Sequence, residues 1–258
     1  MAAGKPSRPT PGKKAGNLRT KAEQEVGPAI ERIFERSSDS VEQRLEAFPK
    51  YVRRQHLTRF IALYELFKQV VDVKGSVVEC GVWRGFGLMT WAKLSAILEP
   101  NNLTRRVYGF DSFSGFPAVH DKDANAINPA VPGDLASDSY DELQALIEQF
   151  DQDRFLGHIP KVELIDGDAT ETIPKFVAEN PHLVISLLFL DFDLYEPTRA
   201  AIEHLVPRMP RGAILAFDEL DNPIWPGETL ALVETLGVGS LRIRRLPFDP
   251  YIGYAVIE

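Results

Sequence analysis

Acidic side chains follow two apolar segments of the chain, at the points where these segments end. Asp191 comes directly after the apolar run at residues 183–190, and Asp218 and Glu219 come directly after the run at 212–217. If the two runs are neighbouring parallel strands, their carboxyl ends open onto one crevice, and the three carboxylates meet there. Clustered carboxylates repel one another unless a cation lies between them, and oxygen ligands suit Mg²⁺. These residues therefore predict a magnesium site.

The competing interpretation of these acidic residues is that each one caps a helix at a strand–helix junction. Asp193 and Asp221, which follow slightly later in the same two segments, fit that interpretation well. For Asp191, together with Asp218 and Glu219, we favour the metal site.

The segment SVVECGVWRGFG at residues 76–87 predicts a cofactor loop. A short apolar run reaches Glu79, the glycines Gly81 and Gly85 follow, and residues 88–98 are predicted as a helix. This order cradles nucleotide-like cofactors, but dinucleotide folds need G-x-G-x-x-G to bind pyrophosphate. A carboxylate before the first glycine repels pyrophosphate and favours S-adenosylmethionine (SAM), which carries an ammonium and a sulfonium. On these residues alone, a tight turn in another kind of α/β protein is an equal alternative.

Asp111 is the candidate ligand for the ribose of such a cofactor. It ends the predicted strand at 105–111, where a carboxylate can hold both ribose hydroxyls. The competing interpretation is that Asp111 caps a turn at Ser112. Residues 112–140 lack periodicity and are dense in Gly, Pro, Asp, Asn and Ser, so we interpret them as a substrate lid, with surface disorder as the alternative.

Alternating strands and helices must position these residues, which predicts an α/β fold. The remaining strands and helices of this pattern are predicted at 140–150, 161–165, 170–180, 183–190, 196–209, 212–217 and 228–236. The run at 183–190 is the most apolar, so we expect it at the centre of a parallel sheet. Two last strands, at 241–247 and 251–257, are joined by only three residues and must form an antiparallel hairpin. This mostly parallel sheet matches the class I SAM-methyltransferase Rossmann-like fold and differs from a dinucleotide dehydrogenase.

The composition is that of one large domain with an N-terminal extension. With 258 residues, of which 44% are hydrophobic, the chain can bury a sizeable core. We divide it into a disordered basic tail at 1–19, an N-terminal helical cap at 20–73 and a SAM-dependent methyltransferase domain at 74–258. We expect the helical cap to be structural, with substrate or subunit contacts as the alternative, and we favour a homo-oligomer.

Charge and cysteine content argue against several classes of partner. The net charge is −8, and because the first 21 residues contribute +6, the rest of the chain carries −14, which argues against a nucleic-acid substrate. The single cysteine, Cys80, permits no disulfide within the chain and fits a reducing cytoplasm. No apolar run is long enough to span a bilayer and no signal-peptide pattern opens the chain, so we expect no membrane association.

Four blocks of sequence resemble the macrocin O-methyltransferase family. These blocks are ECGVWRG at 79–85, YGFDSFSGFP at 108–117, GDATETIP at 167–174 and LDFDLYEPT at 190–198. The resemblance covers roughly residues 50–235 and extends to a deoxysugar methyltransferase of enediyne antibiotic biosynthesis. It implies a bacterial enzyme that depends on SAM and Mg²⁺ and that methylates a sugar hydroxyl of an antibiotic or its precursor.

The resemblance also implies roles for individual residues. The implied cofactor ligands are Glu79, Gly81 and Gly85 for SAM, Asp111 with Ser112 for its ribose, Asp168 with Ala169 for its adenine, and Asp191 beside the methyl donor. The implied metal ligands are Asp191 and Asp218. Two departures concern the same region: Asp218-Glu219-Leu220 stands where the family usually has Asp-Asp-Tyr, and the bulky Phe192 stands where it commonly has glycine. We expect the first to change the metal coordination and the second to alter the pocket.

The chemistry expected of this arrangement is the deprotonation and alignment of a sugar hydroxyl. Mg²⁺ would lower the pKa of the bound hydroxyl, and Asp191 would serve as both metal ligand and base. His120 is a weaker candidate for the base, because a lone histidine in a loop is usually solvated. Tyr195, Trp225 and Glu228 are candidates for the sugar pocket, since an aromatic face stacks on a pyranose; for Trp225, core packing is an equal alternative.

Three other functions stay open on the sequence. A catechol-type Mg²⁺-dependent methyltransferase shares the metal chemistry but takes an aromatic diol. A SAM-binding protein without catalysis would need a broken acidic cluster, and this cluster is intact. An NAD enzyme is disfavoured by the missing glycine pattern and by the terminal hairpin.

Overall fold

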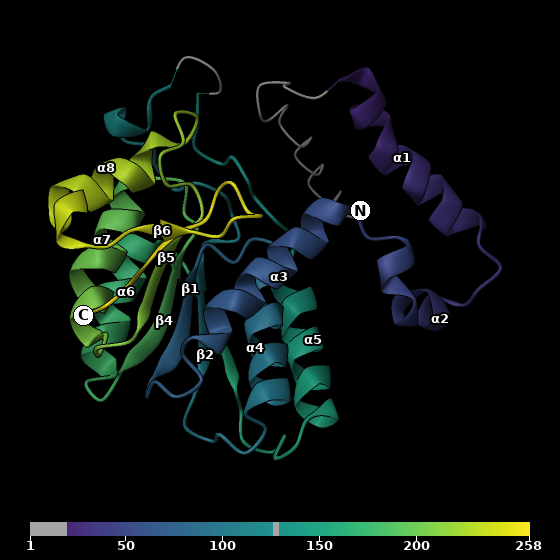
Figure 1. The fold of residues 1–258 in the computed structure, drawn as a ribbon, viewed down its shortest axis with the longest axis horizontal. Coiled ribbons are helices and arrows are strands. Elements are labelled where there is room, and N and C mark those ends of the chain that lie inside the picture. The colour runs from purple at the N-terminus through teal and green to yellow at the C-terminus, as the bar shows by residue number, and fades with distance from the viewer. Residues whose placement is uncertain (1–19, 126–128) are drawn as a thin grey trace, which may run out of the picture.

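The computed structural model describes residues 20–125 and 129–258, which form a seven-stranded sheet with helices on both faces (Figure 1). The strand order is β3-β2-β1-β4-β5-β7-β6. The strands are β1 (Ser76–Cys80), β2 (Val107–Asp111), β3 (Val162–Asp166), β4 (Ile185–Leu190), β5 (Ile214–Phe217), β6 (Arg244–Arg245) and β7 (Gly253–Val256). Strands β1 to β5 pair in parallel, and β7 pairs antiparallel with β5 and β6. The predicted sheet, mostly parallel with an antiparallel C-terminal hairpin, is confirmed.

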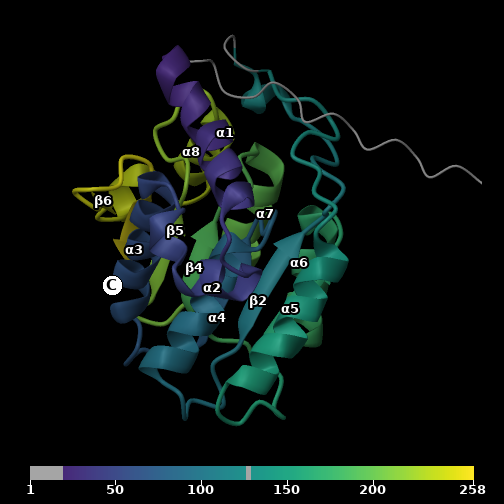
Figure 2. The ribbon, with the colours of Figure 1, turned by 90° about the vertical axis from the view of Figure 1, so that its right-hand side faces the viewer.

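The helices form a layer on each face of this sheet. They are α1 (Lys21–Arg36), α2 (Val41–Glu46), α3 (Arg54–Lys68), α4 (Phe86–Leu98), α5 (Tyr140–Asp153), α6 (Ala169–Glu179), α7 (Tyr195–Leu205) and α8 (Pro226–Thr235). Helices α3, α4 and α5 cover one face, and α6, α7 and α8 cover the other (Figures 1 and 2). The side chains of successive strand residues lie on opposite faces of the sheet. Val77 packs in the core beneath α3 and α4, and Val78 packs in the core beneath α6 and α7.

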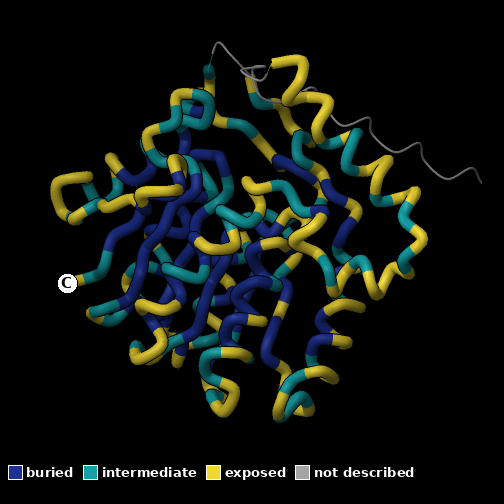
Figure 3. The backbone as a smooth tube through the Cα atoms, turned by 45° about the vertical axis from the view of Figure 1, so that its right-hand side comes forward, coloured by how far each residue is buried: buried dark blue, intermediate teal, exposed yellow. Residues whose placement is uncertain are grey.

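Strand β4 is the centre of the sheet, as its composition predicts. All six residues of β4 are buried, and the strand lies between β1 and β5. The buried backbone gathers in the interior of the molecule (Figure 3). Because helices cover both faces of the sheet, apolar side chains are buried on both sides of the strand. The single polar residue, Ser186, uses its hydroxyl to donate to the carbonyl oxygens of Gly75 and Ser76, each at 3.2 Å. The central strand is therefore apolar throughout except where a backbone acceptor is within reach.

The C-terminal hairpin has shorter strands and a longer connection than predicted. Strand β6 has two residues, and the connection to β7 covers residues 246–252. The cause is Asp249, whose carboxylate accepts hydrogen bonds from the backbone N–H groups of Tyr251 and Ile252, both at 3.0 Å. This turn takes the backbone out of the sheet.

The N-terminal helices fall into two groups. Helices α1 and α2 have no buried residue and project from the body beside α3 (Figure 1). Helix α3 instead buries Leu63, Leu66 and Phe67 in the core between this helix and the sheet. One helix of the predicted cap is thus part of the core. The boundary at residue 73 stays a prediction, and the tail predicted at 1–19 lies outside the described residues. In the described part of the chain, no helix combines the length and the hydrophobicity needed to cross a membrane.

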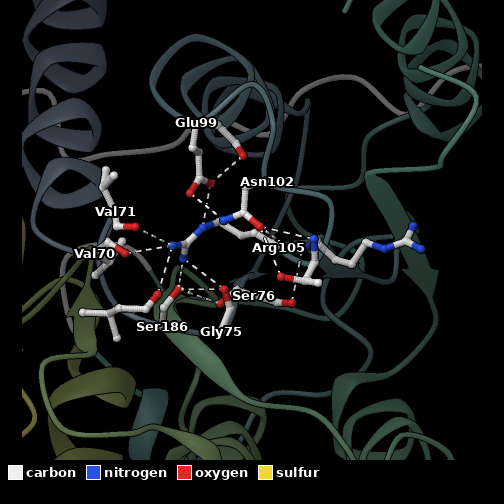
Figure 4. Close-up of polar contacts among 12 residues, drawn as sticks. Val70, Val71, Gly75, Ser76, Glu99, Asn102, Arg105 and Ser186 are labelled. Carbon is white, nitrogen blue, oxygen red and sulfur yellow. Dashed lines mark hydrogen bonds and ion pairs between the residues drawn. The ribbon is translucent and has the colours of Figure 1, made fainter. Parts of the chain in front are cut away.

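A buried arginine ties α3 to the sheet (Figure 4). Arg105 is 2% exposed. Its guanidinium donates to the carbonyl oxygens of Val70 (2.8 Å), Val73 (3.0 Å) and Gly75 (3.0 Å). Its Nε lies 2.6 Å from Oε1 of Glu99, just after α4. The side chain therefore joins the segment after α3 to the start of β1 and the end of α4, and it fixes the position of α3.

Arg105→Met should lower the free energy of unfolding by about 3 kcal/mol, because it removes the ion-pair partner of the buried Glu99 carboxylate and the donor to three backbone carbonyl oxygens. Chemical denaturation followed by circular dichroism measures this loss. Arg208→Met is the matched control: Arg208 donates one exposed hydrogen bond to the carbonyl of Pro181, so its loss should stay near 0.5 kcal/mol. Equal losses in the two variants would contradict the anchoring role of Arg105.

Candidate active site

A cavity of about 650 Å³ opens at the carboxyl ends of the parallel strands. Many residues that the sequence singles out line it: Glu79, Gly81, Asp111, Ser112, Asp168, Ala169, Asp191, Asp218, Glu219 and Trp225. Among the other predicted site residues, Gly85, Tyr195 and Glu228 are not part of the lining. The cavity lies where parallel α/β sheets bind their ligands, so the topology and the residues identify the same place.

Glu79, at the end of β1, is a buried carboxylate that lines the cavity. It is 2% exposed, and its Oε2 has no hydrogen-bond partner among the described residues. Burial raises the pKa of Glu79 well above its ordinary value, the charge of Arg59 opposes that shift, and the charge of Asp111 adds to it. An unpartnered buried carboxylate costs free energy unless a cation binds to it. The arrangement therefore suits a ligand with a positive charge, such as an ammonium group.

Three glycines between the end of β1 and the first turn of α4 allow close packing with neighbouring parts of the chain. A Cβ on Gly87 would lie 1.9 Å from Oε1 of Glu79. A Cβ on Gly81, whose φ is +96°, would lie 1.9 Å from the carbonyl oxygen of Asp191. Gly85 precedes α4 in the left-handed conformation as its N-cap. Gly81 therefore lets the loops after β1 and β4 meet, and Gly87 lets Glu79 fold beneath α4.

Asp111, at the end of β2, organises the loops on both sides of it. Its Oδ2 accepts a hydrogen bond from the N–H of Trp83, and its Oδ1 accepts one from the N–H of Phe113, both at 2.7 Å. Burial raises the pKa of Asp111 despite these donors. Asp111 thus caps the turn at Ser112, as the competing interpretation has it, and it also lines the cavity; its role as a ribose ligand stays a prediction. The hydroxyl of Ser112 donates to the carbonyl of Gly115 at 2.6 Å, which leaves its acceptor lone pairs available.

Asp168 is the N-cap of α6. Its Oδ1 accepts hydrogen bonds from the N–H of Thr170 at 2.9 Å and from the hydroxyl of Thr170 at 2.7 Å. Ala169 is the first residue of α6 and is buried. The two residues form part of the cavity wall beside the end of β3.

The structure brings Asp191 and Asp218 together, but around an arginine. Nη2 of Arg59, which lies on α3, is 2.7 Å from Oδ2 of Asp191, and Nη1 of Arg59 donates to Oδ1 of Asp218. Burial raises the pKa of Asp191 well above its ordinary value, the charge of Asp218 adds to that shift, and Arg59 opposes it. The prediction that these two strand ends converge is thereby confirmed in geometry, with a guanidinium as the cation between them.

Glu219 does not join this pair. Its carboxylate accepts a hydrogen bond from the side-chain amide of Asn222. Burial raises the pKa of Glu219 to about 7, and the charge of Asp218 contributes to the shift. Within residues 20–125 and 129–258, no group of three or more His, Cys, Asp or Glu side chains is arranged to hold a metal ion. The structure thus holds Asp191 and Asp218 on Arg59 and Glu219 on Asn222, and a metal site of these three carboxylates stays a prediction.

Glu228, a candidate for the sugar pocket, lies behind the cavity. It is fully buried on α8, and its Oε1 accepts a hydrogen bond from the N–H of Asp193 at 3.2 Å. Its Oε2 accepts one from the N–H of Glu219 at 3.1 Å. Burial raises the pKa of Glu228 well above its ordinary value. Glu228 thus joins the loops that follow β4 and β5 and positions the acidic residues they carry.

Tyr195, the second such candidate, fastens the long loop after β2 to α7. Its N–H donates to Oδ1 of Asp123 at 2.7 Å, and its hydroxyl donates to Oε2 of Glu234 at 2.6 Å. Nζ of Lys122 lies 4.0 Å from the centre of its ring. Nε2 of His120 is 3.8 Å from a carboxylate oxygen of Glu196, which lines the cavity, but His120 itself is not part of the lining. These contacts hold the loop beside the site, but the structure does not place Tyr195 or His120 in the cavity.

Trp225 and several unpredicted residues complete the wall. The ring centres of Trp225 and Phe116 are 6.0 Å apart at an interplanar angle of 81°, an edge-to-face contact. Phe192 also lines the cavity, where the sequence predicted that its bulk alters the pocket. Further lining residues that the sequence did not indicate are Gln55, His56, Arg59, Trp83, Arg84, Asp249 and Tyr251. They come from α3, the glycine loop and the C-terminal hairpin.

Comparison with known proteins relates this arrangement to one family. The family described as Macrocin-O-methyltransferase (TylF) matches residues 51–229. The 8-demethyl-8-(2,3-dimethoxy-α-L-rhamnosyl)-tetracenomycin-C 4′-O-methyltransferase of Streptomyces olivaceus is 32% identical over 157 residues, which are 57% of this chain and 53% of that protein. The chain thus spans just over half the length of the curated relatives that it matches.

Two solved structures extend the similarity over most of the chain. The crystal structure of CalS11, a calicheamicin methyltransferase, has a TM-score of 0.88 and 37% sequence identity, and the match covers 92% of this chain and 93% of that one. The apo structure of CalS11, described as a TDP-rhamnose 3′-O-methyltransferase, has a TM-score of 0.80 and 36% identity, with coverage of 92% and 95%. The fold is that of the class I SAM methyltransferases, and the chain belongs to the macrocin O-methyltransferase family.

Proposed function

We propose that the chain transfers a methyl group from SAM to a hydroxyl of a deoxysugar in a bacterial antibiotic pathway. The family match supports the reaction type. One relative acts on a rhamnosylated tetracenomycin and another on TDP-rhamnose, which supports a deoxysugar as the acceptor, either nucleotide-linked or attached to a natural product.

The observation that carries the proposal is the placement of Glu79 and Asp191 in one cavity. Glu79 lines the cavity, and one oxygen of its buried carboxylate has no hydrogen-bond partner among the described residues, which suits the cationic end of the methyl donor. Asp191 follows the neighbouring strand, and the loop that carries it meets the cofactor loop at Gly81. A positively charged methyl donor held by Glu79 would therefore lie in the same cavity as a base.

Each remaining cofactor residue has a role that follows from its position. When bound, SAM supplies the methyl group on a sulfonium, which needs no further activation. Glu79 would bind the ammonium group, and Asp111 would accept from the ribose hydroxyls with the lone pairs that its two backbone donors leave free. Asp168 and Ala169, at the start of α6, would lie against the adenine. The protein's main task is then to align and deprotonate the acceptor.

Asp191 is the residue that we propose as the general base. Its carboxylate lines the cavity, and burial raises its pKa well above the ordinary value. A carboxylate with a raised pKa is a stronger base, so it accepts a proton from a hydroxyl more readily. In the absence of a metal ion, Arg59 stabilises the negative charge of Asp191.

We also propose that the reaction depends on Mg²⁺. Asp191 and Asp218 supply carboxylate oxygens that converge on one cationic group, so the donor set fits a hard cation in its chemistry. These two residues would hold the ion, and Glu219 would contribute only after leaving Asn222. When bound, Mg²⁺ would lower the pKa of the acceptor hydroxyl.

The sugar would lie against the aromatic part of the wall. Trp225 and Phe116 present an apolar surface on the side of the cavity formed by the loops after β5 and β2. Such a surface suits the apolar face of a deoxysugar ring. Tyr195 and Glu228 would act indirectly, because they hold the loops that carry these residues.

Assembly and location remain predictions. Val26 and Ile33 on α1 are 41% and 62% exposed, on a helix with no buried residue, which is consistent with a subunit contact in a homo-oligomer. The cytoplasmic location and the absence of a nucleic-acid partner also stay predictions from composition.

The experiment that tests the proposal is a panel of acceptors with deuterated-methyl SAM as the donor. The panel contains TDP-rhamnose, a rhamnosylated natural product and a simple catechol, and mass spectrometry detects the labelled methyl group. We expect label on one of the two sugar acceptors. Methylation of the catechol alone would show that the acceptor is an aromatic diol and not a sugar. If the protein binds SAM but transfers the methyl group to none of the acceptors, the proposed reaction is contradicted.

A further inference from the structure

We propose that Arg59 and a divalent cation compete for the same two carboxylates, so that Arg59 is a built-in counter-ion that the metal must displace. The inference rests on the proposed function in one respect: it takes Asp191 and Asp218 to be the metal ligands. It adds a third residue, from the N-terminal helices, that sets the affinity of the site for metal. The sequence alone gives Arg59 no such role.

The geometry of the guanidinium supports this assignment. Two nitrogens of one planar group reach two carboxylates that follow neighbouring strands: Nη2 lies 2.7 Å from Oδ2 of Asp191, and Nη1 donates to Oδ1 of Asp218. One guanidinium thus makes a charge-assisted hydrogen bond to each of two carboxylates, and such bonds are stronger than those between neutral groups. The carboxylates that a cation would need are therefore already bound to a cation that the protein supplies.

The charges make the two occupants mutually exclusive. Asp191 and Asp218 each already bind the guanidinium through a carboxylate oxygen, so a divalent ion that takes both residues as ligands competes with Arg59 for the same two negative groups. With both cations present, a guanidinium and a divalent ion would lie side by side in a site where Arg59 is only 25% exposed, and like charges at such short range repel strongly. Binding of the metal therefore requires the guanidinium of Arg59 to leave.

The side chain, and not the helix, is the part that can move. Beyond Arg59, α3 is held by Leu63 and Phe67 in the core, and the segment that follows α3 is held by Arg105. Arg59 itself lies in the first half of α3, where no residue is buried, and its guanidinium rests over the ring of Phe189 at 5.3 Å. Rotation of this one long side chain into the cavity would free both carboxylates without disturbing the packing of α3.

The test is the affinity for Mn²⁺, measured by electron paramagnetic resonance on the SAM-free protein. Arg59→Met keeps an apolar stem over Phe189 and removes the competing charge. If Arg59 is bound to the two carboxylates in at least nine-tenths of the molecules, Arg59→Met should bind Mn²⁺ about tenfold more tightly than the unmodified chain, or tighter still. Arg84→Met is the matched control, because Arg84 lines the same cavity but its guanidinium lies over the ring of Trp83. We expect the affinity of this control to stay within about twofold of the unmodified value.

Two further variants keep the result interpretable. Arg59→Lys retains the positive charge without the planar guanidinium and should give an intermediate affinity, so it serves if Arg59→Met folds poorly. The double variant Arg59→Met with Asp191→Asn should lose the gain, which would place the ion at this pair. Titration of the unmodified chain with Mg²⁺ should also shift the nuclear magnetic resonance signal of the Arg59 side chain towards that of a free arginine.

The inference is overturned if Arg59→Met binds Mn²⁺ no more tightly than the unmodified chain, if Arg84→Met shows the same gain, or if neither the unmodified chain nor Arg59→Met binds Mn²⁺. Because the readout is metal binding, these outcomes are independent of the acceptor panel. A protein that methylates a sugar but shows no competition would refute the role of Arg59 and leave the proposed reaction intact.

Discussion

Asp191→Asn should lower kcat for methyl transfer by about 10³-fold while the Kd for SAM changes by less than about threefold. The amide keeps the shape of the side chain and leaves the backbone contact with Gly81 in place. It cannot accept the proton of the acceptor hydroxyl, and it is a poorer ligand for a hard cation. Steady-state kinetics with the best sugar acceptor measures the first quantity, and isothermal titration calorimetry measures the second.

Asp166→Asn is the control for the loss of one carboxylate at this edge of the sheet. Asp166 ends β3, as Asp191 follows β4, but it is exposed and does not line the cavity. Its variant should keep kcat within about twofold of the unmodified enzyme. If Asp191→Asn retained nearly full activity, Asp191 would be neither base nor ligand. If it lost SAM binding in proportion to activity, its role would lie in holding the cofactor.

Gly81→Ala should destabilise the protein by about 4 kcal/mol or more, and the folded fraction should bind SAM poorly. A Cβ at this position would lie 1.9 Å from the carbonyl oxygen of Asp191, and a φ of +96° is strained for any residue with a Cβ. The loops after β1 and β4 would have to separate, which moves Glu79 away from Asp191. Urea denaturation measures the stability, and calorimetry with SAM at low temperature measures the binding.

Gly239→Ala provides the comparison for this substitution. No atom lies within 4 Å of a Cβ built on Gly239, so the change should stay within about 0.5 kcal/mol. A Gly81→Ala variant as stable as the Gly239→Ala variant would show that the two loops do not need to meet, and the shared cavity would lose its structural basis.

The fold could be predicted because its signals are local. The apolar run at 183–190 is continuous since helices cover both faces of β4, and a short link at the C-terminus could only produce an antiparallel hairpin. The convergence of Asp191 and Asp218 also followed, because the ends of neighbouring parallel strands share an edge. The length of the hairpin connection did not follow, since it depends on the turn that Asp249 makes.

The parts of the site that were missed depend on contacts between distant segments. Arg59 precedes Asp191 by 132 positions, and nothing in the pattern of α3 shows which arginine crosses the cavity. Glu219 has the right residue type for a ligand, but its rotamer is set by Asn222. Tyr195 and Glu228 were expected in the sugar pocket because residue type alone does not separate a wall residue from a support behind it. Their contacts make that distinction: Tyr195 binds Asp123 and Glu234, and Glu228 accepts from the backbone of Asp193 and Glu219.

The most direct test is a crystal structure of the protein with S-adenosylhomocysteine and the unmethylated sugar acceptor bound together. We predict that the amino group of the cofactor lies on Glu79 and that the reacting hydroxyl lies about 2.6–3.2 Å from the carboxylate of Asp191, or contacts an ion bound to that carboxylate. A cofactor that leaves Glu79 without a partner, or an acceptor whose reacting oxygen contacts neither Asp191 nor an ion on it, would contradict the account.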